Sequence, residues 1–307
     1  MVRPPKIHAV VRPPPADLLW LGLAVLAIST SGPMIAACAA PALAIAFWRC
    51  FLGSAATSPW VAWRRRNEVR GLTRREWRLI VVSGLLLGAH FATWIPSLRF
   101  TSVASAAALA ATQPIWAVLI ARMRGHHVSG RVWAGIALAL SGVLLLTGFD
   151  FALDPAALIG DALAMVGAVF MAINVTIGQE ARQSVSTSTY TTISYGTAGV
   201  ALLVLCLVLR VPLTGYSAND WLLILGLTVI AQLLGHTLIN KVLATTPATV
   251  TSLAILFEVP GSIIIAALWL GQVPPLVILP ALALLASGVV LVILSGEEGI
   301  AIEEPAV

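Results

Sequence analysis

The chain of 307 residues repeats part of its own sequence, and this repeat limits the fold more than any other feature. Residues 90–143 recur without a gap as residues 236–289, so that Pro114 corresponds to Pro260, 146 positions further along. Periods of about 20–50 residues indicate solenoids, whereas a much longer period indicates a duplicated structural unit. The sequence therefore predicts two related halves.

The composition places both halves in a membrane. Hydrophobic residues make up 59% of the chain, charged residues make up 10%, and the mean hydropathy is +0.96. Soluble domains average about 45–50% apolar and about 25% charged residues. The net charge of +5 comes from basic residues in short loops, so it indicates membrane topology and no nucleic-acid partner. We expect an integral membrane protein in contact with the lipid bilayer.

A helix needs about 20 apolar residues to cross the hydrocarbon core. Ten segments of suitable length and composition follow one another with short connections. They are 17–37, 41–60, 79–98, 101–121, 131–149, 156–178, 188–209, 221–240, 248–270 and 275–294. We therefore expect an all-α integral membrane protein with ten transmembrane helices, five in each half.

Basic residues are distributed unevenly over the loops. Of the 18 Lys and Arg residues, all but three lie on one side of the predicted membrane; Arg49 is inside a span, and Arg99 and Arg210 are on the other side. Because Lys and Arg are retained on the cytoplasmic side, both termini should be cytoplasmic in the inner membrane of a cell. Five spans per half is an odd number, so the halves should be inverted repeats, a plan of secondary transporters.

The predicted organisation has four parts. A cytoplasmic tail of residues 1–16 precedes the first five-helix repeat, which covers residues 17–150. The second five-helix repeat covers residues 151–295, and an acidic cytoplasmic tail covers residues 296–307. We expect no separate soluble domain.

Motifs for catalysis or nucleotide binding do not occur in the sequence. The patterns G-x-x-x-x-G-K-[ST], H-E-x-x-H and G-x-S-x-G are missing, and no nucleophile or paired catalytic carboxylate can be picked out. Cys38, Cys50 and Cys206 lie in apolar runs without the C-x-x-C spacing of a disulfide or zinc site. We expect no enzyme, no cofactor, no metal and no ATP-driven transport by this chain alone.

Polar side chains inside the predicted spans are the remaining candidates for function. Glu258 lies near the middle of the ninth span, two residues before Pro260, and its counterpart in the first half is Thr112. An ionisable group in a membrane helix costs about 2.5–3.5 kcal/mol and usually marks a pathway. Glu258 could carry a proton or meet a substrate ammonium group. The alternative is a neutral carboxyl group that is hydrogen-bonded to a neighbouring helix.

His90 and His236 occupy equivalent positions, and each belongs to a polar face at helical spacing. The first face comprises His90, Trp94 and Ser97, and the second comprises Gln232, His236 and Asn240. Since histidine titrates near neutral pH, either ring could relay a proton in a shared cavity. Two hydrogen-bonded histidines that lock the interface between the halves would explain the same pattern.

Arg49 lies one third of the way along the second span, where its charge needs a partner. It could hold a substrate carboxylate or pair with Glu258, and an ordinary structural ion pair is equally compatible with the sequence. The counterpart of Arg49 in the second half is Tyr195. Gln113 is a weaker candidate from the fourth span.

Longer motifs around these residues resemble a known family. The first half contains G-x-x-x-G-A-H-F-x-x-W from residue 84, T-S-V-A-S from residue 101 and Q-P from residue 113. The second half contains G-H-T from residue 235, L-F-E-V-P from residue 256 and L-G-Q from residue 270. Over nearly all of residues 17–294, the chain resembles the EamA-like branch of the drug/metabolite transporter superfamily.

The sequence departs from this family's pattern at two positions. Val259 separates Glu258 from Pro260, which are commonly adjacent in the family, and Gln272 stands where the family usually carries Glu. The first change could turn the carboxylate slightly. The second removes a charge at the end of the ninth span.

The resemblance implies export, or in some members uptake, of amino acids and other small metabolites through a central cavity. We expect an inner-membrane exporter that works by alternating access, with proton coupling as an option. A metabolite importer or an uncoupled facilitator is the alternative within this class. A non-transporting receptor or complex subunit is the alternative from another class. Whether the chain forms a homodimer stays open.

Overall fold

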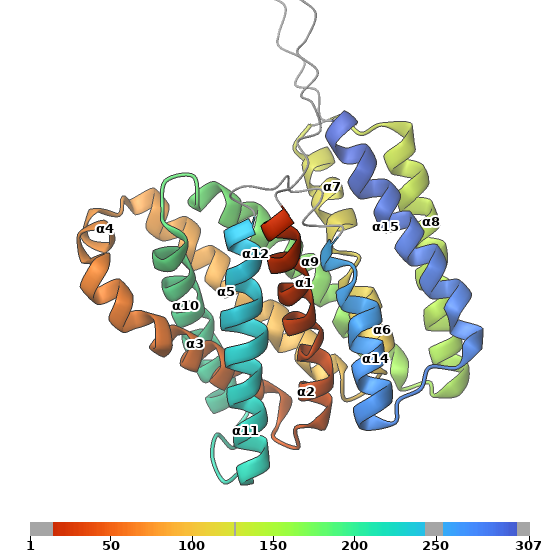
Figure 1. The fold of residues 1–307 in the computed structure, drawn as a ribbon, viewed down its shortest axis with the longest axis horizontal. Coiled ribbons are helices and arrows are strands. Elements are labelled where there is room, and N and C mark those ends of the chain that lie inside the picture. The colour runs from red at the N-terminus through yellow and green to blue at the C-terminus, as the bar shows by residue number, and fades with distance from the viewer. Residues whose placement is uncertain (1–14, 126, 243–253, 300–307) are drawn as a thin grey trace, which may run out of the picture.

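The computed structural model describes residues 15–125, 127–242 and 254–299, and every element in these ranges is helical (Figure 1). The elements of the first half are α1 (Pro15–Ser29), α2 (Ser31–Ala37), α3 (Ala42–Arg64), α4 (Arg66–Gly71), α5 (Arg74–Ser97), α6 (Val103–Ala110), α7 (Gln113–Met123) and α8 (Gly130–Leu153). Those of the second half are α9 (Ala157–Ala181), α10 (Thr187–Val208), α11 (Ala218–Gly226), the π-helix η1 (Leu227–Gly235), α12 (His236–Val242), α14 (Glu258–Leu270), the 3₁₀ helix η2 (Leu276–Ile278) and α15 (Leu279–Gly299).

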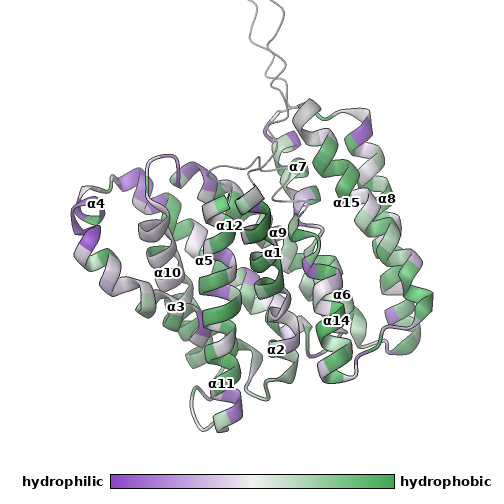
Figure 2. Cartoon of the chain, in the orientation of Figure 1, coloured by the Kyte–Doolittle hydropathy of each residue, from purple (hydrophilic) through white to green (hydrophobic). Residues whose placement is uncertain are grey.

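Eight helical segments in the described ranges are long and apolar enough to cross a membrane. Hydrophobic residues dominate the long helices, whereas hydrophilic residues gather on α4 and at helix ends (Figure 2). Two further helices match predicted spans but fall outside this group, namely α3 and the 13-residue α14. The all-α, multi-pass membrane architecture is thus confirmed. The number of ten transmembrane helices stays a prediction.

The two halves meet through equivalent helices, first of all α8 and α15. A Cβ atom on Gly142 would collide with the backbone nitrogen of Leu285, and one on Gly288 would collide with that of Ala139. Gly142 and Gly288 are repeat equivalents, and so are Ala139 and Leu285, so the contact is reciprocal. From Ala139 to Gly142 along α8, the contacted residue moves back along α15 from Gly288 to Leu285. These equivalent helices therefore run antiparallel, which makes the repeats inverted.

The equivalent helices α3 and α10 also pack against each other in antiparallel orientation. The hydroxyl of Ser54 donates to the carbonyl of Thr192 at 3.0 Å, and the Thr192 hydroxyl donates to that of Thr57 at 2.7 Å. Further along α10, Gly199 allows the backbone of Phe51 to approach closely, 3.4 Å from the position of a Cβ atom. Small and hydroxylated residues thus bring these helices together where lipid gives no hydrophobic drive for their association.

Three predicted spans are interrupted. The first is divided at Thr30 between α1 and α2, and the fourth is divided at residues 111–112 between α6 and α7. Proline lacks an N–H group, so it fits the first turn of a helix without losing a hydrogen bond, whereas it weakens a helix interior. Pro33 in α2 and Pro114 in α7 both lie in first turns. The prolines therefore account for new helices starting just before them.

The ninth span corrects our expectation for Glu258. We placed this residue near the middle of a continuous helix, but it is the first residue of α14, after a turn at residues 256–257. Pro260 favours this start, because proline is tolerated best in the first turn of a helix. Residues 248–253 of the predicted span lie outside the described residues.

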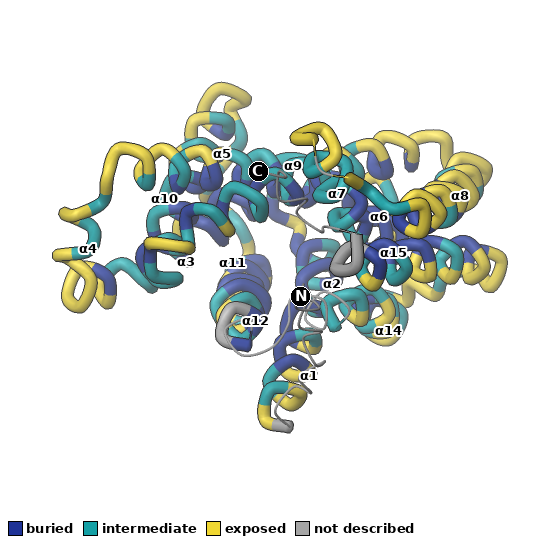
Figure 3. The backbone as a smooth tube through the Cα atoms, turned by 90° about the horizontal axis from the view of Figure 1, so that it is seen from above, coloured by how far each residue is buried: buried dark blue, intermediate teal, exposed yellow. Residues whose placement is uncertain are grey.

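The loops define two ends of the molecule. We call the end with α4, which carries most of the arginines between α3 and α5, the basic face; it lies at the top in Figure 1. At the opposite face, Arg99 Nη2 donates to the carbonyls of Cys38 and Ala40 at 2.6 and 2.8 Å. The Asp220 carboxylate accepts from Ala39 N at 2.7 Å. Seen from above, buried residues gather toward the middle of the molecule, and exposed residues line the outer side of α8 (Figure 3).

Candidate functional site

Arg49 is held inside the molecule from two sides. The residue is 2% exposed, and its Nε donates to Oε1 of Gln232 at 2.8 Å, while Gln232 Nε2 donates back to the Arg49 carbonyl at 3.2 Å. Its guanidinium carbon lies 4.1 Å from the centre of the Phe91 ring. Within the described ranges, Nη1 has no hydrogen-bond partner. The guanidinium is therefore fixed in place with one donor group left over.

This arrangement connects the two halves. Phe91 comes from α5 in the first half, Gln232 comes from the π-helix in the second, and α3 carries Arg49 between them. Gly53, one turn after Arg49, makes room for the Gln232 amide, because a Cβ atom there would collide with Nε2. Gln232 lies on the polar face that we expected to line the cavity, four residues before His236, but it was not among the predicted site residues.

His90 packs against α9. Its Nδ1 lies 2.9 Å from the carbonyl oxygen of Gly167, and its ring stacks on Trp94 with a centroid distance of 5.9 Å and an interplanar angle of 10°. A carbonyl only accepts, so Nδ1 carries the hydrogen of this bond. Proton exchange at His90 would then have to use Nε2. Trp94 is buried beside it, and its Nε1 has no partner among the described residues.

His236 and Glu258 are less enclosed than His90. Both are partly exposed, and each is the first residue of a helix, α12 and α14 respectively. Both side chains lie within electrostatic range of Arg49, and His236 is also within range of His90. We call Arg49, Phe91, Gln232, His90, His236 and Glu258 the Arg49 cluster.

The interruption of the first span positions Glu258. Ser29, the last residue of α1, accepts through its carbonyl from the hydroxyl of Ser262 at 3.0 Å. A Cβ atom on Gly261 would collide with the Ser29 side chain, so α14 begins directly against the end of α1. In the first turn of a helix, the macrodipole favours a negative charge. The start of α14 therefore offers a favourable dipole to a negative charge on Glu258, which lies within electrostatic range of Arg49.

The remaining predicted residues lie at different distances from this cluster. Tyr195 is buried in α10 and lies within electrostatic range of Arg49. Gln113 is the first residue of α7, and no hydrogen bond within the described part of the chain joins it to the cluster. Asn240 belongs to α12, but its side chain lies outside the described part. Thr112, the counterpart of Glu258, donates locally to the Leu109 carbonyl at 2.6 Å.

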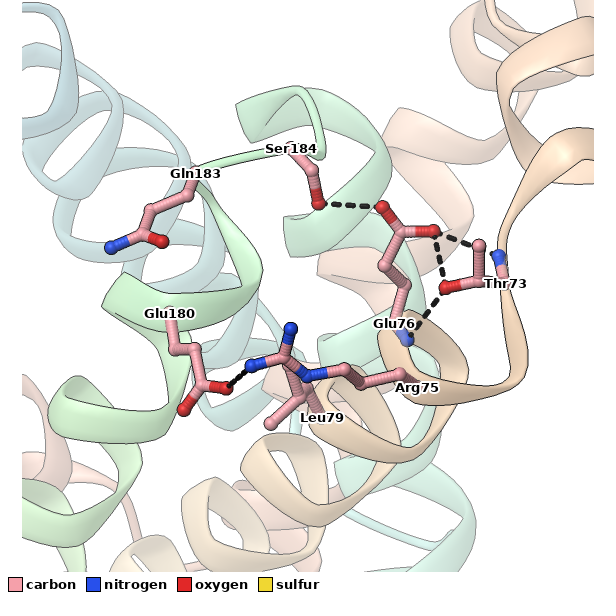
Figure 4. A pocket seen from close by; sticks show the side chains of 7 residues that line it. All are labelled: Thr73, Arg75, Glu76, Leu79, Glu180, Gln183 and Ser184. Carbon is pink, nitrogen blue, oxygen red and sulfur yellow. Dashed lines mark hydrogen bonds and ion pairs between the residues drawn. The ribbon is translucent and has the colours of Figure 1, made fainter.

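A second polar group lies at the basic face, around a pocket of about 300 Å³ (Figure 4). Arg75 Nη2 contacts Glu180 Oε1 at 2.5 Å, and the Ser184 hydroxyl donates to Glu76 at 2.5 Å. These contacts tie the start of α5 to the end of α9. Exposed ion pairs of this kind contribute about 0–1 kcal/mol, so the group is a surface contact between helices.

Comparisons with known proteins agree with this architecture. The model of the EamA-like transporter family matches the chain twice, at residues 16–148 and 158–294. A solved crystal structure aligns with 91% of this chain and 97% of its own, with 19% sequence identity and a TM-score of 0.62, a likeness that concerns the fold alone. Curated protein sequences give no match. Two family matches that together cover most of the sequence show that the chain belongs to the EamA-like transporter family.

Proposed function

We propose that the chain is a secondary transporter that exports amino acids or related small metabolites across the inner membrane by alternating access. Membership of the EamA-like family supports transport as the general activity. The inverted packing of the halves supports alternating access, since such repeats can rock about a site between them. Substrate, direction and coupling are the proposed part.

The free Nη1 group of Arg49 carries this proposal. A buried guanidinium with an unused donor is suited to a carboxylate, which arginine binds through charge-assisted hydrogen bonds. Glu258 lies within electrostatic range of Arg49 and comes from the other half of the chain. A carboxylate there is suited to an ammonium group. One positive and one negative group within electrostatic range of each other are complementary to a zwitterion, which is the form of an amino acid at neutral pH.

Glu258 also offers a route to proton coupling. A partly exposed carboxylate inside a membrane protein can bind either a proton or a substrate ammonium group, but not both at once. Competition for one carboxylate would exchange a substrate leaving the cell for a proton entering it. His236, which is partly exposed in the same cluster, would pass the proton on.

For the orientation, we propose that the basic face is cytoplasmic. This proposal rests on the arginines of the connection between α3 and α5, which follow the positive-inside pattern. A reporter enzyme that is active only in the cytoplasm should be active when fused to either terminus. Activity of a periplasmic reporter at the same positions would reverse the orientation.

An untargeted comparison of small molecules in culture medium tests the function. We would compare cells that make the wild-type chain, the Glu258→Gln variant, the Glu180→Gln variant, or no chain. Glu180→Gln is the matched control, because it makes the same chemical change in an exposed pair at the basic face. We expect an amino acid or related compound to accumulate with the wild type and the control only.

The other outcomes of this comparison are equally informative. Equal accumulation with Glu258→Gln would keep the exporter and remove Glu258 from the mechanism. No difference among the four cultures, with the protein present in the membrane, would contradict export and favour uptake.

A further inference from the structure

Two buried carboxylates lie outside the Arg49 cluster, in the hairpin between α8 and α9. Asp150, near the end of α8, is 8% exposed, and Asp161, near the start of α9, is 2% exposed. The two side chains interact with each other and with Thr101, in the turn before α6. Gly160 brings them together, because a Cβ atom there would lie 2.7 Å from the Thr101 nitrogen. The absence of a side chain at position 160 lets α9 press directly onto this turn.

Three of the four carboxylate oxygens of this pair lack a well-formed hydrogen bond in the described part of the chain. Within the described ranges, no well-formed hydrogen bond reaches either oxygen of Asp161, Oδ2 of Asp150 or the Thr101 hydroxyl oxygen. Two adjacent buried carboxylates cannot both be charged at low cost, since each repels the other and neither is solvated. The unpartnered Asp161, aimed at Asp150, therefore points to a positively charged ligand between them.

Basic side chains nearby are engaged elsewhere. Arg99, two residues before Thr101, donates to the carbonyls of Cys38 and Ala40. The nearby acidic residue Asp154 is exposed, and its carboxylate accepts from the Ala156 nitrogen. Among the other helices that pack on α8 or α9, α6 and η2 contain no titratable residue, and α15 has none before its last turn. The titratable residues of α5 and α7 lie at the basic face or in the Arg49 cluster.

We propose that Asp150 and Asp161 share a proton and form a proton-binding site at the face opposite α4. Ser105, which is fully buried in α6, and Thr101 place hydroxyl groups beside the pair. Because the site joins α6, α8 and α9, the bound proton holds the hairpin against α6, and its loss puts two negative charges in contact. The pH on that side of the membrane sets its occupancy. This proposal does not depend on the identity of the substrate.

Thermal unfolding of the purified full-length chain in detergent tests the proposal. A proton that is bound only in the folded state stabilises it at low pH, and this contribution is lost as the pH rises. Between about pH 5 and about pH 8, we expect the Asp150–Asp161 pair to lower the wild-type midpoint by about 2–4 °C. Asp161→Asn removes one of the two charges, so this part of the pH dependence should disappear without loss of folding at low pH.

The control is Asp154→Asn, the same change at an exposed neighbour, which should keep the wild-type pH dependence. Glu258 and the histidines titrate in all of these proteins, so the difference between variants reports on the pair. Infrared spectra give a second readout, in which a carboxylic acid band of the wild type should be missing from Asp161→Asn.

Two results would overturn the proposal. An unchanged pH dependence and an unchanged acid band in Asp161→Asn would show that the pair holds no proton. Sodium chloride that stabilises the wild type at about pH 8, but not Asp161→Asn at the same ionic strength, would make the pair a cation site instead.

Discussion

The two halves of this chain share a framework and differ in the charges that they carry. Gly142 and Gly288 make the same close contact in reciprocal directions. At two other equivalent positions, the halves differ: Arg49 corresponds to Tyr195 in the second half, and Glu258 corresponds to Thr112 in the first. Each half thus supplies one charge. The Arg49 cluster has both signs of charge only because the two halves pack together.

The two histidines show the same contrast. His90 lies in the continuous helix α5 and is fixed by the carbonyl of Gly167. His236 follows directly after a π-helix, an irregularity that is frequent at functional sites, and it is partly exposed. Identical residues at equivalent positions therefore have different surroundings. We infer that His90 acts in packing and His236 in transport.

The largest effect should come from the shared framework. Gly288→Leu inserts a side chain where even a Cβ atom would collide with the backbone of Ala139, and overpacking costs about 1–3 kcal/mol or more. Gly142→Leu should be equally damaging, because its contact is the reciprocal one. We expect both to abolish the folded monodisperse peak in size-exclusion chromatography. Gly148→Leu is the control, since nothing lies within 4 Å of a Cβ atom there; a mild effect of one of the two glycine variants would break the symmetry.

The next effect concerns the charges on which the halves differ. Arg49→Gln removes the buried cation, and we expect substrate flux in liposomes to fall by at least about tenfold, which is about 1.4 kcal/mol. Tyr195→Phe, at the equivalent position, removes a hydroxyl group and no charge, so it should change flux by less than about twofold, which is about 0.4 kcal/mol. Arg49→Lys keeps the positive charge but cannot form the bidentate contact of a guanidinium, so it tests the two contributions separately. Equal effects at positions 49 and 195 would contradict the asymmetry.

Much of the framework could be predicted from the sequence. The apolar segments predict membrane helices, because hydropathy is a local property of the sequence. The repeat predicts two related halves, because equivalent residues are separated by a fixed offset. Helix interruptions were harder to predict. Prolines also occur inside helices of this chain, as Pro59 and Pro96 show, so Pro260 alone did not place Glu258 at a helix start.

The site was less predictable, because its contacts join distant parts of the chain. Arg49 and Gln232 are 183 residues apart, and only the packing of α3 against η1 makes them partners. Asp150 could only be read as a loop charge, since its proximity to Asp161 depends on the close approach that Gly160 allows. Single residues in apolar spans were visible in the sequence; their pairing was not.

The histidines provide a smaller effect. His90→Phe should lower the free energy of unfolding by about 1–3 kcal/mol, because the carbonyl of Gly167 loses its buried partner. His236→Phe should lower proton-driven flux several-fold with a smaller change in stability. Denaturant unfolding and flux measured on the same preparations check this contrast. The reverse pattern, with transport lost at His90 and stability lost at His236, would contradict our assignment.

The smallest effect is expected for a contact of α4. This helix lies in the connection between α3 and α5, whereas the equivalent connection between α10 and α11 contains no helix. Partial burial opposes the charge on Glu68, but hydrogen bonds from Ser186 and Thr189 prevail and lower the pKa of its carboxyl group. A lowered pKa gives stability that is present at neutral pH and is lost as the pH falls through the value of the folded state. Glu68→Gln should cost about 0.5–1.5 kcal/mol at neutral pH.

The pH dependence of that variant sharpens the prediction. The difference between the wild type and Glu68→Gln should shrink below about pH 4, where the wild-type carboxyl group also becomes neutral. Unfolding midpoints over a pH series would measure it. If the difference in unfolding midpoint between the two proteins stays constant at acidic pH, the charge of Glu68 is not what stabilises this contact.

Flux of amino acids in liposomes that contain only this chain tests the central claim most directly. We would load the liposomes with an amino acid mixture, impose a pH gradient, and compare the wild type with Arg49→Gln, Glu258→Gln and Glu180→Gln. The account predicts that the gradient accelerates efflux of a zwitterionic substrate by the wild type and by Glu180→Gln, and that both cluster variants lose it. Equal gradient-driven efflux by all four proteins would contradict a transport site built from one charge of each half.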